Sequence, residues 1–367
     1  MLILAIETSC DDTACSVLKI TGNKKPKFKI LSNVVSSQIK IHKPYGGVVP
    51  TLAAREHIKN LPVVFRRTLR EAKVKIEKID YIAVTQGPGL IIALWAGVNF
   101  ARDIAQKYGK KIIPTNHIAG HIFSNFIENP AEMNPVRSRA HAKSASPKDR
   151  GVATSNGVKF PMLNIVVSGG HTELILMKKM GSYEILGSTR DDAAGEAFDK
   201  FAKMLGLGYP GGPIVSKLAR KGDPTLYPLP RPMIASKDYD FSFSGLKTAA
   251  LYFFKKHPWV AEKKFLLHFC ASFEQAIVDV IVSKTIRAAK EYKVKTVALS
   301  GGVSANQKLR HQLETAVKKE LPKTRFLAPD RKFTTDNATM IAVAAYFNRK
   351  KATSWKNLDA DANLELI

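Results

Sequence analysis

The sequence is poor in cysteine. Its 367 residues include only Cys10, Cys15 and Cys270, and no CxxC pair. An odd number of widely spaced thiols argues against a disulfide framework, and the missing CxxC pairs argue against a zinc ribbon. We expect the three thiols to be small buried groups in a reducing compartment.

A targeting segment is also lacking. The N-terminal run LILAIE has no basic flank and ends before Thr8 and Ser9, so it is too short for a signal peptide. No apolar stretch looks long enough to span a bilayer. We therefore expect a cytoplasmic protein with no membrane partner.

Acidic residues are scarce relative to basic ones, with 31 Asp and Glu against 57 Lys and Arg and a net charge of +26. Such a chain attracts polyanions, among which nucleic acids come first. Basic residues gather at 24–29 and 66–70, although many others are scattered as they would be for solubility alone. The balance favours contact with nucleic acid.

The chain repeats one pattern of elements. Residues 2–7 (LILAIE) and 162–167 (MLNIVV) each predict a strand, and in each half a turn and two further strands follow. Both halves then reach a strand, a glycine turn and a helix, as YIAVT-QGPG-LIIALWAG and TVALS-GGVS-ANQKLRHQ. We predict an α/β fold of two lobes with a ligand cleft between them, in which each lobe is one copy of a duplicated βββαβα unit.

Three glycine-rich turns stand at the joints of this pattern. SGG at 168–170 and 300–302 follows apolar strands, and YPGGP at 209–213 separates two helical stretches. Glycine after a strand lets backbone N–H groups approach a phosphate. The turns therefore predict a nucleotide cradle. Neither a P-loop, whose GxxxxGK[ST] pattern is missing, nor a Rossmann site is expected.

Two histidines are spaced for one metal ion. His117 and His121 in NHIAGH would share a helix face, and Asp336 in TTDNA could join them. Two imidazoles and a carboxylate leave coordination positions open for a ligand. The alternative is that both histidines merely lie on a polar helix face.

Carboxylates accompany the turns. Asp11 and Asp12 follow the first strand, and Asp191, Asp192 and Asp199 lie in DDAAGEAFDK. We expect Asp191 or Asp192 to cap the helix that follows. Asp199, inside that helix and near a glycine loop, is a candidate for sugar hydroxyls.

Ordered motifs along nearly the whole chain resemble one family. They are IETSCDDT, GPGL, NHIAGH, VVSGGHTEL, DDAAGEAFDK, YPGGP, DFSFSGLKTA, SGGVSANQKLR and TTDNAT. They are similar to the TsaD family, the tRNA N6-adenosine threonylcarbamoyltransferases with the actin-like ATPase (ASKHA) fold. The resemblance implies that threonylcarbamoyl-AMP donates its threonylcarbamoyl group. The acceptor would be N6 of the adenosine just 3′ of the anticodon, in tRNAs reading codons that begin with adenine, and AMP would leave.

The resemblance also implies roles for residues. His117, His121 and Asp336 would hold one divalent metal, iron(II) with zinc as the alternative. The substrate-binding set would be Val166, Val167, Ser168, Gly169 and Gly170 along the adenylate, Asp199 on the ribose, Gly212 beside the nucleoside and Asn306 near the base or phosphate. Asp11 or Asp12 would help to remove the amine proton or position the groups. ATP with Mg²⁺ stays open as a further ligand.

Partners and boundaries follow from the same comparison. TsaB-like and TsaE-like subunits would assist a bacterial member, and a TsaC-like synthase would supply the donor. We expect one lobe at 1–115 and a second at 116–330 that starts with the metal helix, with 331–367 packing back near the cleft and the first lobe. A polar, basic insertion at about 131–158 is expected to be a flexible loop, which either touches tRNA or is only solvated.

Two other functions compete with this hypothesis. A kinase or an ATP-gated regulator of the same fold would use a nucleotide and Mg²⁺ but would not need two histidines at a metal. A metallopeptidase is disfavoured because NHIAGH lacks the glutamate of HExxH enzymes.

Overall fold

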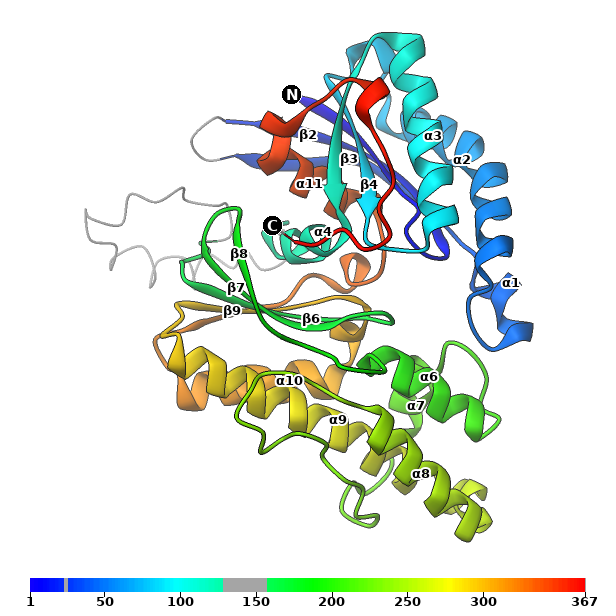
Figure 1. The fold of residues 1–367 in the computed structure, drawn as a ribbon, viewed down its shortest axis with the longest axis vertical. Helices are drawn as coiled ribbons and strands as arrows, with labels where there is room; N and C mark the ends of the chain where they lie inside the picture. The colour runs from blue at the N-terminus through cyan, green and yellow to red at the C-terminus, as the bar shows by residue number, and fades with distance from the viewer. Residues whose placement is uncertain (23–25, 128–156, 367) are drawn as a thin grey trace.

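The computed structural model describes residues 1–22, 26–127 and 157–366 (Figure 1). Nearly all of the insertion expected at about 131–158 lies outside the described residues.

The strands of the described residues form two five-stranded sheets. The first has the order β3-β2-β1-β4-β5, built from β1 (Leu2–Glu7), β2 (Asp12–Thr21), β3 (Lys27–Ser37), β4 (Tyr81–Gly87) and β5 (Lys111–Asn116). The second has the order β10-β9-β6-β7-β8, built from β6 (Met162–Val167), β7 (Thr172–Lys179), β8 (Ser182–Ser188), β9 (Thr296–Ser300) and β10 (Arg325–Leu327). In each sheet the first strand of that half is central. The second and third strands lie on one side of it and the fourth and fifth on the other, so the two orders are the same. The predicted duplication of an antiparallel meander followed by parallel strands is confirmed.

Helices cover the sheets (Figure 1). Those of the first half are α1 (Ile39–His42), α2 (Pro50–Ala72), α3 (Ile91–Tyr108) and α4 (His117–Phe123). Those of the second half are α6 (Ala194–Met204), α7 (Gly211–Ala219), α8 (Ser244–Lys256), α9 (Lys263–Glu291), α10 (Gln307–Glu320) and α11 (Ala338–Asn348). Short 3₁₀ segments are η1 (Lys43–Tyr45), η2 (Ile76–Lys78), η3 (Ser124–Phe126), η5 (Pro258–Ala261), η6 (Gly302–Ala305), η7 (Arg331–Phe333), η8 (Arg349–Lys351) and η9 (Trp355–Asn357).

Helix α11 crosses from one half to the other. It follows the last strand of the second sheet, yet it packs on β1, β2 and β5 of the first. Its sequence, ATMIAVAAYFN, is apolar on every side, as suits a helix buried all round. This crossing brings the residues just before α11 to the start of α4.

Helix α4 lies against α11 and also contacts β6 and β9 of the second sheet. At Gly120 the two helices are so close that a Cβ would stand 2.8 Å from Ile341 Cδ1. The glycine of NHIAGH therefore permits the contact that joins the two halves.

Helix α9 corrects one expectation. By length and composition it could cross a membrane, contrary to our reading that no stretch is long enough. However, 61% of its apolar window is buried inside the protein, where it packs on α7 and α10. It is the central helix of the second core.

Candidate active site

The predicted metal ligands lie together. Asn116 caps α4 by accepting a hydrogen bond from Ala119 N over 3.0 Å, so the helix begins at His117. Asp336 Oδ1 lies 3.6 Å from His117 Nε2 and 3.2 Å from His121 Nε2. One donor atom from each side chain falls within 4.8 Å of the others. The three side chains could share one cation.

The donor set fits a divalent metal on independent grounds. His117 and His121 are only 6% and 1% exposed. Within the described residues, Nδ1 of His121 has no hydrogen-bond partner, and its Nε2 has only Asp336 Oδ1 beside it, at 3.2 Å. A buried imidazole with unsatisfied nitrogens is costly unless a ligand completes it. Imidazole nitrogens and a carboxylate oxygen are ligands that iron(II) and zinc both accept.

Glu7, at the end of β1, supports the first histidine. His117 Nδ1 lies 3.1 Å from both Glu7 Oε2 and Ser9 Oγ, so its Nε2 faces Asp336. Burial opposes ionisation of Glu7, but the charge of His117 together with the hydrogen bonds from His117 and Thr85 outweighs it and lowers the pKa of Glu7. In metal sites, a ligating histidine commonly donates the hydrogen of its other ring nitrogen to a carboxylate, which orients the ring. The sequence pointed to Glu7 as one of the carboxylates near the first turn, but it did not predict the contact with His117.

His171 links the metal ligands to the first glycine loop. Burial, followed by the charges of His117 and His121, lowers the pKa of His171 to about 4, so its ring is neutral near pH 7. Its backbone N donates to Ser168 Oγ over 3.0 Å, and its carbonyl accepts from Ser168 N over 2.8 Å. Sequence reasoning assigned the residues at 168–170 to a nucleotide cradle but gave His171 no role. The position of this histidine directly after the glycines was the signal that could have revealed its role.

The first glycine loop presents open backbone. Val166 and Val167 are buried in the cores on opposite faces of β6, so a ligand could reach only their main chain. A Cβ added at Gly169 or Gly170 would meet no atom of the described residues within 4 Å. Gly302, in the loop after β9, has the same open surroundings. These loops leave room for a ligand at the ends of β6 and β9.

The second glycine loop lies at the start of α7. Gly212 falls in the first turn of this helix, where the nearest atom to an added Cβ is Phe198 Cβ at 3.9 Å. Asp199 Oδ1 accepts from Gly211 N over 2.6 Å, and burial raises the pKa of Asp199. Residues 206–211 do read GxGxxG, but they join helices α6 and α7. Without a preceding strand this is no Rossmann fingerprint.

Asn306 is the N-cap of α10, one residue before the helix in which it was expected. Its Oδ1 accepts from Leu309 N over 2.9 Å. Its Nδ2 donates to Ser216 Oγ over 2.8 Å and to Glu274 Oε1 over 2.7 Å. Protein groups thus use both amide hydrogens and one lone pair of the oxygen.

Asp11 and Asp12 lie where β2 begins. Burial raises the pKa of Asp12 to about 7, and the negative charges of Asp336 and Asp11 add to that effect. Burial and Asp336 likewise raise the pKa of Asp11. Asp12 Oδ1 is buried without a hydrogen-bond partner in the described residues. A carboxyl group that titrates near neutrality suits proton transfer.

The capping role predicted for Asp191 or Asp192 is wrong. Helix α6 has Ala193 as its N-cap, with no side-chain bond. Asp191 Oδ1 instead accepts from the backbone N of Phe243 and Ser244, where α8 begins, over 2.8 and 3.2 Å. Asp192 pairs with two lysines, Lys200 and Lys247. Contacts across the fold therefore replaced the local cap.

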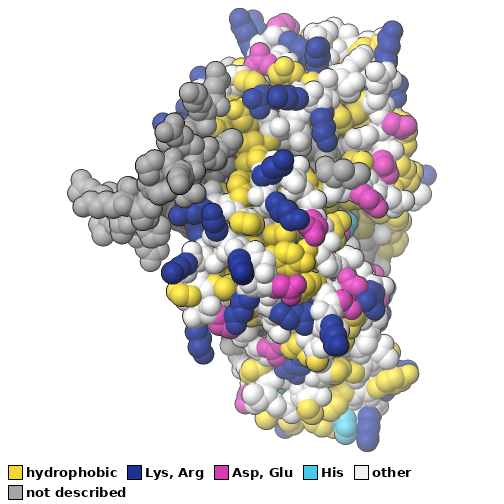
Figure 2. Space-filling model, turned by 60° about the vertical axis from the view of Figure 1, so that its left-hand side comes forward, with side chains coloured by type: hydrophobic (Ala, Val, Ile, Leu, Met, Phe, Trp, Pro, Cys, Tyr) yellow, Lys and Arg dark blue, Asp and Glu magenta, His cyan; other side chains and the backbone are white. Residues whose placement is uncertain are grey.

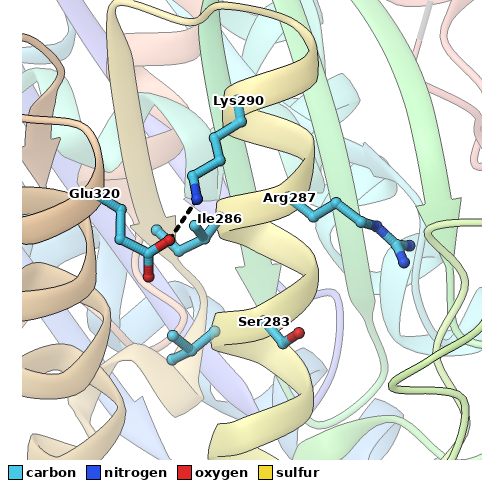
Figure 3. A pocket seen from close by; sticks show the side chains of 6 residues that line it. Ser283, Ile286, Arg287, Lys290 and Glu320 are labelled. Atoms are coloured by element: carbon cyan, nitrogen blue, oxygen red, sulfur yellow. Dashed lines mark hydrogen bonds and ion pairs between the residues drawn. The ribbon is translucent and has the colours of Figure 1, made fainter.

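A groove of about 260 Å³ on the outer side of α9 lies apart from this site. Figure 3 shows its lining, in which Lys290 Nζ meets Glu320 Oε2 at 2.6 Å. Glu320 ends α10, whereas Asn306 caps its beginning, and 14 helical residues span roughly 20 Å. The groove takes no part in the site.

Charge on the surface agrees with a polyanionic substrate. Figure 2 shows Lys and Arg side chains over both halves on the face that it presents, with fewer Asp and Glu among them. On this face the basic side chains are spread rather than confined to one spot.

The two matching sheets, with helices crossing between them, define the actin-like ATPase (ASKHA) fold. The solved structure of T. kodakarensis HypF has the same fold, with a TM-score of 0.55 and 13% identity over 95% of this chain and 47% of that one. The family model "TsaD: tRNA N6-adenosine threonylcarbamoyltransferase" matches residues 29–146 and 139–343.

Curated relatives agree with the family model. The tRNA N6-adenosine threonylcarbamoyltransferase of Thermosipho africanus (strain TCF52B) is 46% identical over 367 residues, which is 100% of both chains. That of Listeria monocytogenes serotype 4b (strain CLIP80459) is 46% identical over 343 residues, 94% of this chain and 90% of the other. The chain belongs to the TsaD family. It is a transferase that modifies adenosine in tRNA, which confirms the predicted family and enzyme class and displaces the kinase and peptidase alternatives.

Proposed function

We propose that the chain transfers threonylcarbamoyl from threonylcarbamoyl-AMP to N6 of the adenosine just 3′ of the anticodon, in tRNAs that read codons beginning with adenine. AMP leaves as the new N–C bond forms. One spatial relationship supports this proposal above the others. His171 is hydrogen-bonded to Ser168 in the open loop and lies close enough to His117 and His121 for their charges to lower its pKa.

The metal, iron(II) by family resemblance and zinc as the alternative, would be held by His117, His121 and Asp336. Bound there, it would supply Lewis acidity toward the oxygens of the donor. Glu7 fixes the ring of His117, and Asn116 fixes the start of α4. These contacts hold the three donors in place before a ligand arrives.

The adenylate of the donor would lie along the glycine loops. The space beside Gly169 and Gly170 is empty of described atoms, so its phosphate could approach their backbone N–H groups. The free oxygen of Asp199 would accept from a ribose hydroxyl, since its Oδ1 already holds Gly211. Gly212 and Asn306 would border the nucleoside, where Asn306 retains one acceptor lone pair.

Asp12 is the better candidate for proton transfer from the N6 amine. An aromatic amine is a weak nucleophile, so a base that takes its proton as the bond forms lowers the barrier. The pKa of Asp12, raised to about 7, suits this role near neutral pH. Asp11 would assist through position and charge.

Other assignments remain proposals of the same kind. They are TsaB-like and TsaE-like partner subunits, a TsaC-like source of the donor, ATP with Mg²⁺ as a further ligand, and a cytoplasmic location. We divide the chain into lobes at 1–115 and 116–330, with 331–367 returning to the first lobe. The contacts of α11 with β1, β2 and β5 support that return.

Transfer from a defined donor tests the proposal. Metal-loaded protein and its candidate partners are incubated with threonylcarbamoyl-AMP and an unmodified tRNA transcript. The tRNA is then digested to nucleosides, which are identified by mass spectrometry. We expect N6-threonylcarbamoyladenosine and an equal amount of AMP. Modification that requires ATP and does not occur with the adenylate would contradict the proposed donor.

A further inference from the structure

Helices α7 and α10 both contact one buried carboxylate, which belongs to helix α9. Glu274, on α9, is only 2% exposed. Its Oε1 accepts hydrogen bonds from Ser216 Oγ on α7 over 2.5 Å and from Asn306 Nδ2 at the start of α10 over 2.7 Å. Asn306 Nδ2 also donates to Ser216 Oγ over 2.8 Å. Glu274 therefore joins α7 to the beginning of α10, alongside the direct bond between Asn306 and Ser216.

Both of these helices begin at glycine loops, and each loop is packed on a neighbour. A Cβ at Gly211, where α7 starts, would stand 2.6 Å from Phe198 O on α6. A Cβ at Gly301, in the loop before α10, would stand 2.4 Å from Val167 O on β6. Neither loop can shift without disturbing the element beside it.

The loop after β6 is fixed to α6 in the same way. Gly195 N donates to Ser168 O over 3.1 Å, and a Cβ there would stand 2.6 Å from the same oxygen. The contacts thus form a closed ring. It runs from the loop after β6 to α6, to α7, through Glu274 to α10, and back to the loop after β6. Backbone packing at glycine makes most of the joints, whereas the joint between α7 and α10 depends on a side chain.

We propose that Glu274 is a positioning residue for the adenylate, which sets the spacing between the walls at Gly212 and Gly302 without touching the ligand. The inference rests on the proposed adenylate site. A carboxylate oxygen can accept from two donors at once, and here Ser216 and Asn306 converge on one. Without it only the direct bond between Asn306 and Ser216 links α7 to α10, so the spacing of the two walls is less tightly held. The metal ligands, on α4 and before α11, keep their arrangement.

Variants at this joint test the proposal, with AMP as the probe and full-length protein in a calorimetric titration. We expect Glu274→Ala to weaken AMP binding about tenfold or more, because two half-buried donors, Ser216 and Asn306, lose their shared acceptor. Glu274→Gln, which keeps one acceptor oxygen, should restore part of the affinity. Ser216→Ala should weaken binding about threefold, since it removes both bonds of Ser216 but leaves Asn306 bonded to Glu274. Bound metal should stay the same in all three variants, and KM for the donor should rise more than kcat falls.

Glu291→Gln is the matched control, because Glu291 lies on the same helix and accepts from Tyr239 Oη over 2.5 Å. It should leave AMP binding unchanged. Equal weakening by Glu291→Gln and Glu274→Gln would overturn the proposal, since any lost bond on α9 would then suffice. Unchanged AMP affinity in both Glu274→Gln and Ser216→Ala would overturn it too, even if Glu274→Ala failed to fold. Wild-type protein that binds no AMP would instead refute the adenylate site itself.

Discussion

Glu7 Oε2 lies 3.1 Å from Nδ1 of His117, so the first strand of the chain orients the first histidine of α4. The two residues belong to different elements, and the contact fixes which ring nitrogen faces Asp336. The metal site therefore depends on the first sheet as well as on its own helix.

Replacing Glu7 tests this dependence. Glu7→Gln keeps the shape of the side chain but removes its charge. We expect metal affinity to fall about 10- to 100-fold, as when other residues that hydrogen-bond to metal ligands are replaced. Competition with a chelator of known affinity measures it. Glu173→Gln, at a carboxyl group whose pKa is raised by burial alone, is the control. Equal metal affinity in wild type and Glu7→Gln would show that this contact does not support the metal.

Space above the first glycine loop can be filled with a single methyl group. Gly170→Ala should fold normally, because its Cβ meets no described atom within 4 Å. It should nevertheless weaken AMP binding by about 1 to 2 kcal/mol, roughly tenfold. Gly245→Ala, in α8, is the control, and we expect it only to stabilise the helix by about 1 kcal/mol. If Gly170→Ala binds AMP as tightly as Gly245→Ala does, the nucleotide does not lie above the first glycine loop.

The raised pKa of Asp12 predicts how stability changes with pH in the metal-free protein. Its folded pKa of about 7 exceeds the unfolded 3.8, so between these values the native state binds more protons than the unfolded state. The free energy of unfolding therefore falls as pH rises from 3.8 to 7 and stays low above that range.

Asp12→Asn removes this penalty. The variant should exceed wild type in unfolding free energy by about 1 to 3 kcal/mol near pH 8, and the gain should fade toward about pH 4. Denaturant titrations across this pH range measure it. A stability difference that does not vary with pH would mean that the pKa of Asp12 is not raised.

Local patterns predicted much of this structure. Apolar runs predicted four strands of each sheet, including β6 over Met162–Val167 as observed, but they did not predict the edge strands β5 and β10. Spacing placed His117 and His121 on one helical face, because that depends only on helix geometry. What brings Asp336 to them is the crossing of α11, a contact between distant elements that no local pattern encodes.

The misses have the same cause. Asp191 precedes α6, so sequence reasoning predicted a cap there, but the chain returns at Phe243 and offers its N–H groups instead. Glu274 looked like any polar residue of a long helix. Only packing revealed that it is buried between α7 and α10.

Metal content per chain, for wild type and for Asp336→Ala, tests the central claim most directly. Both proteins are loaded with iron(II) without oxygen, desalted and assayed by elemental analysis, with circular dichroism to confirm their fold. We expect one equivalent in wild type and close to none in Asp336→Ala, because two histidines alone hold the ion weakly. A full equivalent in folded Asp336→Ala would contradict a site made by His117, His121 and Asp336.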